Sequence, residues 1–173
     1  MAIKLVLQMD KSDIREALVA RLNTMKLAAM RAANQARETA THSETVARSK
    51  YETFGLEASY LAHGQTQRVE EFARSQQAFS ELTLREFDVN AAIALSAVVV
   101  ILDEKDVEQT LFIGPSAGGV RFSVASTMGT DVEIMVITPV SPLGTALIGA
   151  LVNDVVTINI ADTVKTYEII EVY

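Results

Sequence analysis

The chain has 173 residues, of which 49% are hydrophobic and 21% are charged. This composition is typical of a globular protein with one domain or two small ones. The absence of cysteine excludes disulfides, thiolate metal sites and a cysteine nucleophile. No apolar run is long enough to span a bilayer, and the first residues lack the pattern of a signal peptide. We therefore expect a cytoplasmic protein without a membrane partner.

Charge is divided unevenly along the chain. Residues 1–85 hold 12 of the 15 basic and 10 of the 22 acidic side chains, a net charge of +2. Residues 86–173 hold 3 basic and 12 acidic side chains, a net charge of −9, together with all three prolines. This shift predicts a domain boundary near residue 86. It fits a division of function, and equally the ordinary preference of long helices for Lys and Arg.

A long helix is predicted from about residue 11 to about residue 40. Asp10 and Ser12 are both suitable N-cap residues. After them, apolar residues recur at spacings of four and three, as in a coiled coil, and the alanines among them allow close helix approach. The apolar positions are Ile14, Leu18, Leu22, Met25, Ala29, Ala32 and Ala36.

A second helix is predicted from about residue 50 to about residue 84. The hydroxyl-rich stretch from Thr39 to Ser49 predicts a turn, because such side chains compete with helical hydrogen bonds. Ser49 and Glu52 then have the spacing of a capping box. Two long helices with a short connection pack antiparallel, which predicts a coiled-coil hairpin over residues 1–85 with its tip at about 40–52. The second apolar pattern comprises Ala58, Ala62, Gln65, Val69, Phe72, Gln76 and Phe79.

The second half of the chain has the shorter period of β-strands. Ser141 and Pro142 have the chemistry of an N-cap and a first helical position, which predicts one short helix over about 143–150. The fold class is therefore α+β: a two-helix hairpin followed by a small antiparallel sheet with a single short helix. The predicted strands are 95–102, 107–113, 120–124, 132–138, 155–160 and 164–172.

Candidate chemistry is concentrated near the predicted hairpin tip. Carboxylates at such an end could complete the shell of a loosely held Mg²⁺, although solvated helix-end charges explain the same residues. Basic side chains along the rod could contact phosphates, or could simply keep the rod soluble. Two histidines, His42 and His63, are too few for a zinc site or a triad. The acidic candidates are Glu44, Glu52 and Glu57, and the basic ones are Arg37, Arg48, Lys50 and Arg68.

The C-terminal sequence VITPVSPLGTALIGALVNDVVTI, followed by KTYEIIEV, resembles the GreA/GreB family of transcript-cleavage factors. These factors enter the secondary channel of bacterial RNA polymerase. The resemblance covers about residues 95–173 and implies an FKBP-like C-terminal domain, 86–173, on a coiled-coil hairpin, 1–85. It further implies RNA polymerase as the partner, with indirect contact to nascent RNA. Docking is implied around Ser141, Pro142, Leu143 and Leu147.

The expected tip motif is missing. Standard cleavage factors carry Asp-x-x-Glu-Asn-Ala-Glu-Tyr, and the corresponding stretch here runs from Thr53 to Tyr60. Aligned on Ala58 and Tyr60, the two metal-binding acids become Thr53 and Leu56, neither of which binds Mg²⁺. Glu44 and Glu52 could substitute, but their spacing does not reproduce the motif. Binding to polymerase is therefore better supported than stimulation of cleavage.

We accordingly expect no enzymatic activity and no cofactor of the protein's own. At most it stimulates the intrinsic RNA cleavage of the polymerase and shares Mg²⁺ with the polymerase active centre. One alternative is a regulator that occupies the channel without cleavage. Alternatives of another class are an FKBP-like chaperone or isomerase and a purely structural coiled-coil module.

Overall fold

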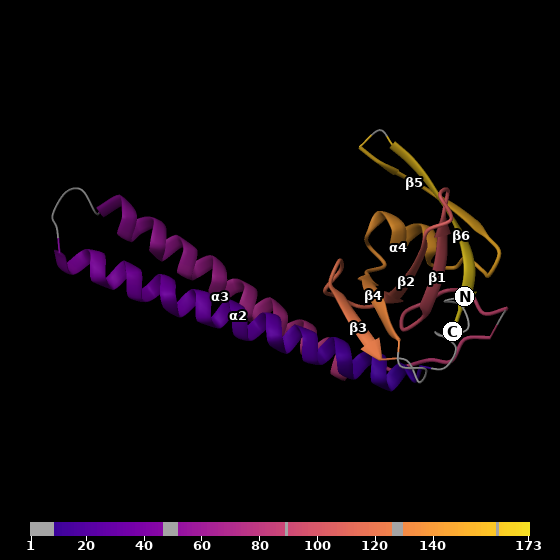
Figure 1. Ribbon diagram of the computed structural model, residues 1–173, viewed down its shortest axis with the longest axis horizontal. Coiled ribbons are helices and arrows are strands. Elements are labelled where there is room, and N and C mark those ends of the chain that lie inside the picture. The colour runs from indigo at the N-terminus through magenta and orange to yellow at the C-terminus, as the bar shows by residue number, and fades with distance from the viewer. Residues whose placement is uncertain (1–8, 47–51, 89, 126–129, 162) are drawn as a thin grey trace. The chain divides into compact units, whose positions relative to one another are not determined.

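The computed structural model describes residues 9–46, 52–88, 90–125, 130–161 and 163–173 (Figure 1). The chain divides into two compact units. One unit is Val19–Gln77, and the other comprises Ala78–Tyr173 together with the residues up to Leu18. The first turns of the first helix and the last residues of the second helix thus group with the C-terminal part of the chain.

The predicted hairpin is confirmed as two helices, α2 (Lys11–Val46) and α3 (Glu52–Ser80) (Figure 1). Helix α2 continues beyond its predicted end near residue 40. The hydroxyls of Thr39 and Thr41 donate to the carbonyls of Gln35 and Arg37, at 2.9 and 3.0 Å. Because each hydroxyl is satisfied one turn back, these threonines remain inside the helix instead of ending it.

The ends of the helices follow the predicted capping only in part. The carboxylate of Asp10 accepts the backbone N–H of Ser12 at 2.7 Å, so Asp10 is the cap of α2. The predicted cap of α3, Ser49, lies outside the described residues. Helix α3 ends at Ser80, a few residues before the predicted end near 84.

Small residues form the helix interface in the half of the hairpin nearest its connection. The coiled-coil pattern is confirmed there, except that Ala33 is buried where Ala32 was predicted. Small side chains bury little apolar area, so we expect this half of the hairpin to be its less stable part. The buried residues are Ala33, Ala36 and Ala40 on α2, and Gly55, Ala58 and Ala62 on α3.

Gln76 explains why the second helical pattern contains glutamine. Its Nε2 atom donates to the carbonyl of Val19 at 3.3 Å, and its Oε1 atom accepts from Lys26 Nζ at 2.6 Å. Gln76 therefore joins α3 to α2 by polar contacts at a position where an apolar side chain would only pack.

The six predicted strands are all present and form one sheet (Figure 1). Their order in the sheet is β3-β4-β2-β1-β6-β5. The strands are β1 (Val98–Asp103), β2 (Glu108–Ile113), β3 (Arg121–Ala125), β4 (Asp131–Ile137), β5 (Val155–Ile160) and β6 (Thr163–Val172).

The sheet is mixed, so the prediction of a purely antiparallel sheet was wrong. Strands β2 and β4 are parallel, with Thr110 opposite Ile134. The reason is the position of β3, which pairs antiparallel with β4 on the side away from β2. The chain crosses to the outer edge first, and β4 then returns in the direction of β2. The remaining neighbouring strands are antiparallel.

Both faces of the sheet are covered. Helix α4 (Pro142–Leu147) packs its Leu147 into the main core, together with Phe87 and Ile93 from the segment before β1. On the other face, Phe79 from the end of α3 lies against Phe112 of β2, with ring centroids 6.1 Å apart. Both phenylalanine side chains are fully buried.

Lys11 is a buried charge where α2 begins. Its Nζ atom donates to the carbonyl of Arg85 and lies 4.5 Å from the ring centre of Phe87. Burial lowers the pKa of Lys11 to about 8, partly opposed by the nearby Glu86 carboxylate. The ammonium group of Lys11 therefore joins the start of α2 to the segment before β1, although the nearby Glu86 charge offsets only part of the cost of burying it.

Candidate functional site

The acidic candidates gather where the two helices are connected. Glu44 lies in the last turn of α2, and Glu52 is the first residue of α3. Their side chains lie outside the described part of the structure, as do Arg48 and Lys50. Glu57 is exposed one turn into α3. The fold thus brings the backbone of Glu44 and Glu52 to the same end of the hairpin, as predicted.

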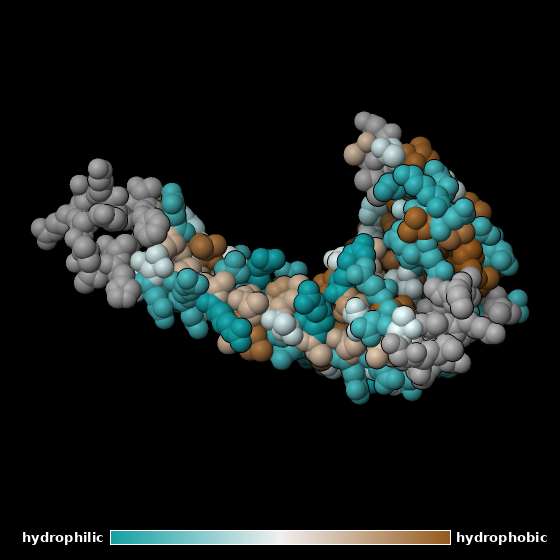
Figure 2. Space-filling model, in the orientation of Figure 1, coloured by the Kyte–Doolittle hydropathy of each residue, from teal (hydrophilic) through white to brown (hydrophobic). Residues whose placement is uncertain are grey.

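Apolar side chains occupy the described surface of α3 beside this connection. Leu56 and Tyr60, four residues apart on one helix face, are 55% and 69% exposed. Leu61, next to Tyr60, is also exposed. Figure 2 shows a hairpin surface that is largely hydrophilic with separate hydrophobic patches.

At one position of the expected Mg²⁺ site, the described side chain offers no ligand. Leu56, at a position where the family's motif has a ligand, presents only hydrocarbon, whereas Mg²⁺ requires oxygen ligands. Within the described ranges, no group of three or more His, Cys, Asp or Glu side chains could hold a metal ion. The expectation of a shared Mg²⁺ stays a prediction, because the side chains of Glu44 and Glu52 lie outside the described part of the structure.

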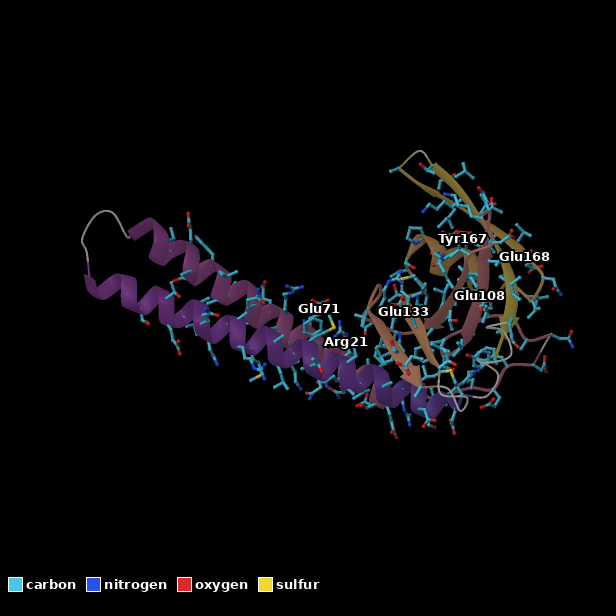
Figure 3. All side chains as sticks on the ribbon, in the orientation of Figure 1. Arg21, Glu71, Glu108, Glu133, Tyr167 and Glu168 are labelled. Atoms are coloured by element: carbon cyan, nitrogen blue, oxygen red, sulfur yellow. The ribbon has the colours of Figure 1, made fainter. Side chains whose placement is uncertain are left out.

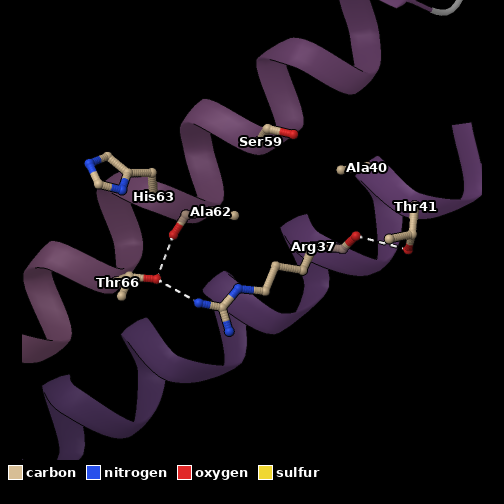
Figure 4. Close-up of a pocket in the computed structure, with 7 residues that line it drawn as sticks. All are labelled: Arg37, Ala40, Thr41, Ser59, Ala62, His63 and Thr66. Carbon is tan, nitrogen blue, oxygen red and sulfur yellow. Dashed lines mark hydrogen bonds between the residues drawn. The ribbon is translucent and has the colours of Figure 1, made fainter. Parts of the chain in front are cut away.

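A groove runs between the helices further along the hairpin (Figure 4). One guanidinium nitrogen of Arg37 donates to the hydroxyl of Thr66 at 3.1 Å, and this hydroxyl donates to the carbonyl of Ala62 at 2.8 Å. Arg37 is thereby positioned across the groove from α2 to α3, with one of its five N–H groups used. The groove has a volume of about 470 Å³ and is lined by Arg37, Ala40, Thr41, Ser59, Ala62, His63 and Thr66.

Polar side chains line this groove from both helices. Arg37 of α2 supplies a fixed positive charge, and exposed His63 lines the groove from the facing helix α3 (Figure 4). A phosphate group fits this chemistry, because guanidinium N–H groups bind phosphate oxygens in pairs. Arg68, the other basic candidate that the structure describes, is exposed on α3.

The predicted docking residues around α4 differ in how accessible they are. The hydroxyl of Ser141 accepts the N–H of Gly144 at 3.0 Å and donates to the carbonyl of Thr138 at 2.8 Å. Ser141 therefore caps α4, as predicted, and Pro142 is the first helical residue. Leu143 is half-buried against the core, and Leu147 is fully buried. The side chain of Leu147 is thus not available to a partner.

Val140, just before α4, is an exposed apolar residue that the sequence analysis did not name among the docking residues. Its side chain is 89% exposed, the largest fraction among the exposed large hydrophobic residues described. The signal was the sequence Pro139-Val140-Ser141-Pro142, since two prolines leave a short loop that neither extends the strand nor enters the helix. Val140, two residues before α4, and Pro142, its first residue, are both exposed and together form an apolar knob.

These elements define a class of protein: an α-helical hairpin combined with a mixed-sheet domain that carries a single capped helix. Residues 89–173 match the family described as transcription elongation factor, GreA/GreB, C-terminal. This match assigns the C-terminal part of the chain, residues 89–173, to the GreA/GreB family of transcription elongation factors. No curated protein sequence matches it.

Solved structures of the same kind are similar at low identity. The structure of the transcription factor Gfh1 has 16% identity and a TM-score of 0.38, over 91% of this chain and 94% of that one. The GreA factor homolog 1 (Gfh1) protein of Thermus thermophilus has 17% identity and a TM-score of 0.36, over 90% and 94%. GreA/GreB from Nitrosomonas europaea has 16% identity and a TM-score of 0.34, over 65% and 88%. The family assignment rests on residues 89–173.

None of the helices that the structure describes combines the length and the apolar character that crossing a bilayer needs.

Proposed function

We propose that the protein is a bacterial regulator of transcription elongation. In this proposal it binds RNA polymerase through residues 86–173 and inserts its hairpin into the secondary channel. The observation that carries the proposal is the GreA/GreB family match over residues 89–173. On this proposal the protein works in the cytoplasm with the polymerase and has no enzymatic activity of its own.

The hairpin supports the proposal by its length. Helix α2 has 36 residues and α3 has 29. At the rise of an α-helix, these lengths correspond to roughly 54 and 44 Å. Arg37 and Arg68 are the described basic residues that would face polymerase or nascent RNA along this length.

We favour a regulator that does not stimulate cleavage. Leu56, which is exposed beside Tyr60, presents an apolar side chain where cleavage factors of the family have a metal-binding acid. The hydrocarbon side chain of Leu56 fills space and excludes water, but it offers no ligand to a catalytic metal. The protein would then tune the polymerase by occupying the channel.

An FKBP-like isomerase is less well supported. Such an enzyme needs an open pocket lined by aromatic side chains. In the described part of the C-terminal domain, the side chains of Phe87, Phe112, Phe122 and Tyr167 are all buried.

The exposed knob of Val140 and Pro142 is the proposed contact with polymerase on the C-terminal domain. Full-length protein is expected to bind core RNA polymerase in a pull-down and in a titration by fluorescence anisotropy. Val140→Asp should weaken binding at least tenfold, because it places a charge at the centre of an apolar contact. The matched control is Val107→Asp, at a position that is also exposed but lies in the β1–β2 turn. Failure of the full-length protein to bind would overturn the proposal.

A second assay addresses cleavage. Backtracked elongation complexes with end-labelled RNA are incubated with the protein, and short 3′ fragments are resolved on a gel. We expect no increase in fragments over polymerase alone, and slower or altered elongation instead. Release of fragments that is lost in the Glu44→Ala, Glu52→Ala double variant would show that these two carboxylates replace the family's motif.

A further inference from the structure

The two edges of the sheet differ in chemistry. Strands β3 and β5 are the edge strands, and each has a neighbour on one side only. An edge strand exposes backbone N–H and C=O groups that another strand can pair with, and proteins commonly block such edges with charged residues, prolines or bulges. Strand β3 carries Arg121, which forms an ion pair with Glu133 of β4 at 2.5 Å. Glu133 is labelled among the side chains in Figure 3.

Strand β5 has none of these protective features. Its six residues, VVTINI, include no charged residue, no proline and no glycine. The side chain of Val155 is 62% exposed at the start of β5, and Val164, opposite Asn159 towards the other end of the β5–β6 hairpin, is 59% exposed. Hydrophobic surface is visible where this hairpin lies (Figure 2).

The backbone register identifies which groups of β5 face the open edge. The N–H of Ile169 donates to Asp154 at 2.9 Å, and its carbonyl accepts from Asn153 at 2.8 Å. In an antiparallel ladder, bonding residues alternate along each strand. From Ile169, every second residue of β6 therefore bonds to its partner on β5. The partners of these residues are Val156, Ile158 and Ile160, whose backbone groups bond to β6. The edge-facing residues are therefore Val155, Thr157 and Asn159.

We propose that β5 pairs antiparallel with β5 of a second copy of the chain, about a two-fold axis at Thr157. Thr157 is the middle one of the three edge-facing residues, so this register uses all three on both strands. Thr157 pairs with its own copy, and Val155 pairs with Asn159 of the other copy. Each of these pairs exchanges two backbone hydrogen bonds, which gives about six in total.

The side chains agree with this register. The register pairs exposed residues with exposed residues, so both strands keep the same orientation of their side chains. Buried Val156 and Ile158 stay on the core face, and exposed Val155, Thr157 and Asn159 stay on the solvent face. No charged residue within β5 faces another across the axis. The strand is therefore complementary to itself, which is what a two-fold interface requires.

The same observations favour a closed dimer over a growing chain. Pairing consumes β5 of both copies, and the remaining edges are the two β3 strands. Arg121, with its ion pair to Glu133, occupies that edge. The interface is small compared with the roughly 1,200 Å² of weak but specific complexes, so we expect a dissociation constant of roughly tens of micromolar.

The test uses the full chain in sedimentation velocity and light scattering, from about 5 to about 500 µM. The wild-type mass should rise with concentration from 18.8 kDa towards twice that value. Thr157→Lys places two ammonium groups opposite each other at the axis and should weaken dimerisation at least tenfold. The matched control is Ser123→Lys, the same new charge at an exposed position of the other edge strand, and it should dimerise like the wild type.

A cross-link tests the register itself. Opposite residues of a hydrogen-bonded antiparallel pair have Cα atoms about 5.5 Å apart, within the range of a disulfide. The chain has no cysteine, so Thr157→Cys introduces a single thiol. Mild oxidation should give a covalent dimer for Thr157→Cys and little for Ser123→Cys. A wild type that stays monomeric throughout, or a Thr157→Lys variant that dimerises unchanged, would overturn the proposal, as would equal cross-linking of the two cysteine variants.

Discussion

Gly114, at the end of β2, lies directly against the ring of Phe79 from α3. A β-carbon added to Gly114 would stand 2.6 Å from the Cε1 and Cζ atoms of that ring and 3.1 Å from Val136. The ring of Phe79 cannot easily move away, because it is fully buried and also packs against Phe112. Glycine at position 114 is therefore what allows Phe79 to cover this face of the sheet.

Gly114→Ala should destabilise the protein by about 1–3 kcal/mol, the usual range for overpacking a tight core. The measurement is the free energy of unfolding in urea. Gly64→Ala is the control, since Gly64 lies inside α3 and an added β-carbon meets nothing within 4 Å. That variant should gain about 0.5–1 kcal/mol from its higher helix propensity. Equal stability of the two variants would contradict the contact with Phe79.

Lys11 makes stability depend on pH in the alkaline range. Burial lowers its pKa from 10.5 to about 8 in the folded protein. Between these two values the unfolded chain binds more protons than the folded chain, so stability rises with pH across this window. Lys11→Met removes the titrating group, so the stability of the wild type relative to this variant should increase from pH 8 to 10.5.

The readout for Lys11 is the difference between the unfolding free energies of the wild type and Lys11→Met, measured at several pH values. This difference should be constant between pH 6 and 7, where Lys11 is protonated in both states. It should then shift in favour of the wild type above pH 8. A difference that does not change up to pH 10.5 would show that the ammonium group is solvated.

Ser141 was predicted as a docking residue, and its contacts make it a structural one as well. Ser141→Ala removes the cap of α4 and should cost about 1 kcal/mol in urea unfolding. Ser123→Ala, an exposed serine on β3, is the control and should change stability by less than about 0.5 kcal/mol. Polymerase binding by Ser141→Ala should fall far less than that of Val140→Asp. A larger loss for Ser141→Ala would assign its hydroxyl to the interface.

Helical periodicity was the most informative signal in the sequence. The repeating apolar positions predicted two antiparallel helices, because burial against one partner helix demands that spacing. The end of α2 was missed for a local reason, namely that Thr39 and Thr41 bond back to their own helix. Such a bond is one of two options for a threonine, and composition alone does not choose between them.

Sheet topology and the docking surface were less predictable. A strand pattern shows which residues face the core, but it does not name the neighbouring strand, and so the parallel pair of β2 and β4 was missed. In a six-residue helix such as α4, burial depends on what covers it. Leu147 faces the core and Val140 faces solvent, although both are apolar residues of one short segment.

The last prediction rests on the proposed function and restores the two acids of the family's motif that this chain lacks. Thr53→Asp with Leu56→Glu places two carboxylates three residues apart, on one face at the start of α3. Because Leu56 is already more than half exposed, the change should cost little stability. The double variant should release short 3′ RNA from backtracked complexes, whereas we expect the wild type to release none.

The matched control for this gain of function is Thr53→Asn with Leu56→Gln, which has the same shape without the charge. It should bind polymerase like the wild type and release no RNA, because amides are weak ligands for Mg²⁺ compared with carboxylates. If the acidic variant binds polymerase but releases nothing, the alignment on Ala58 and Tyr60 is wrong and the tip is not at the start of α3. If it releases RNA, the hairpin reaches the active centre, and the absence of acids at positions 53 and 56 is what keeps the natural protein from stimulating cleavage.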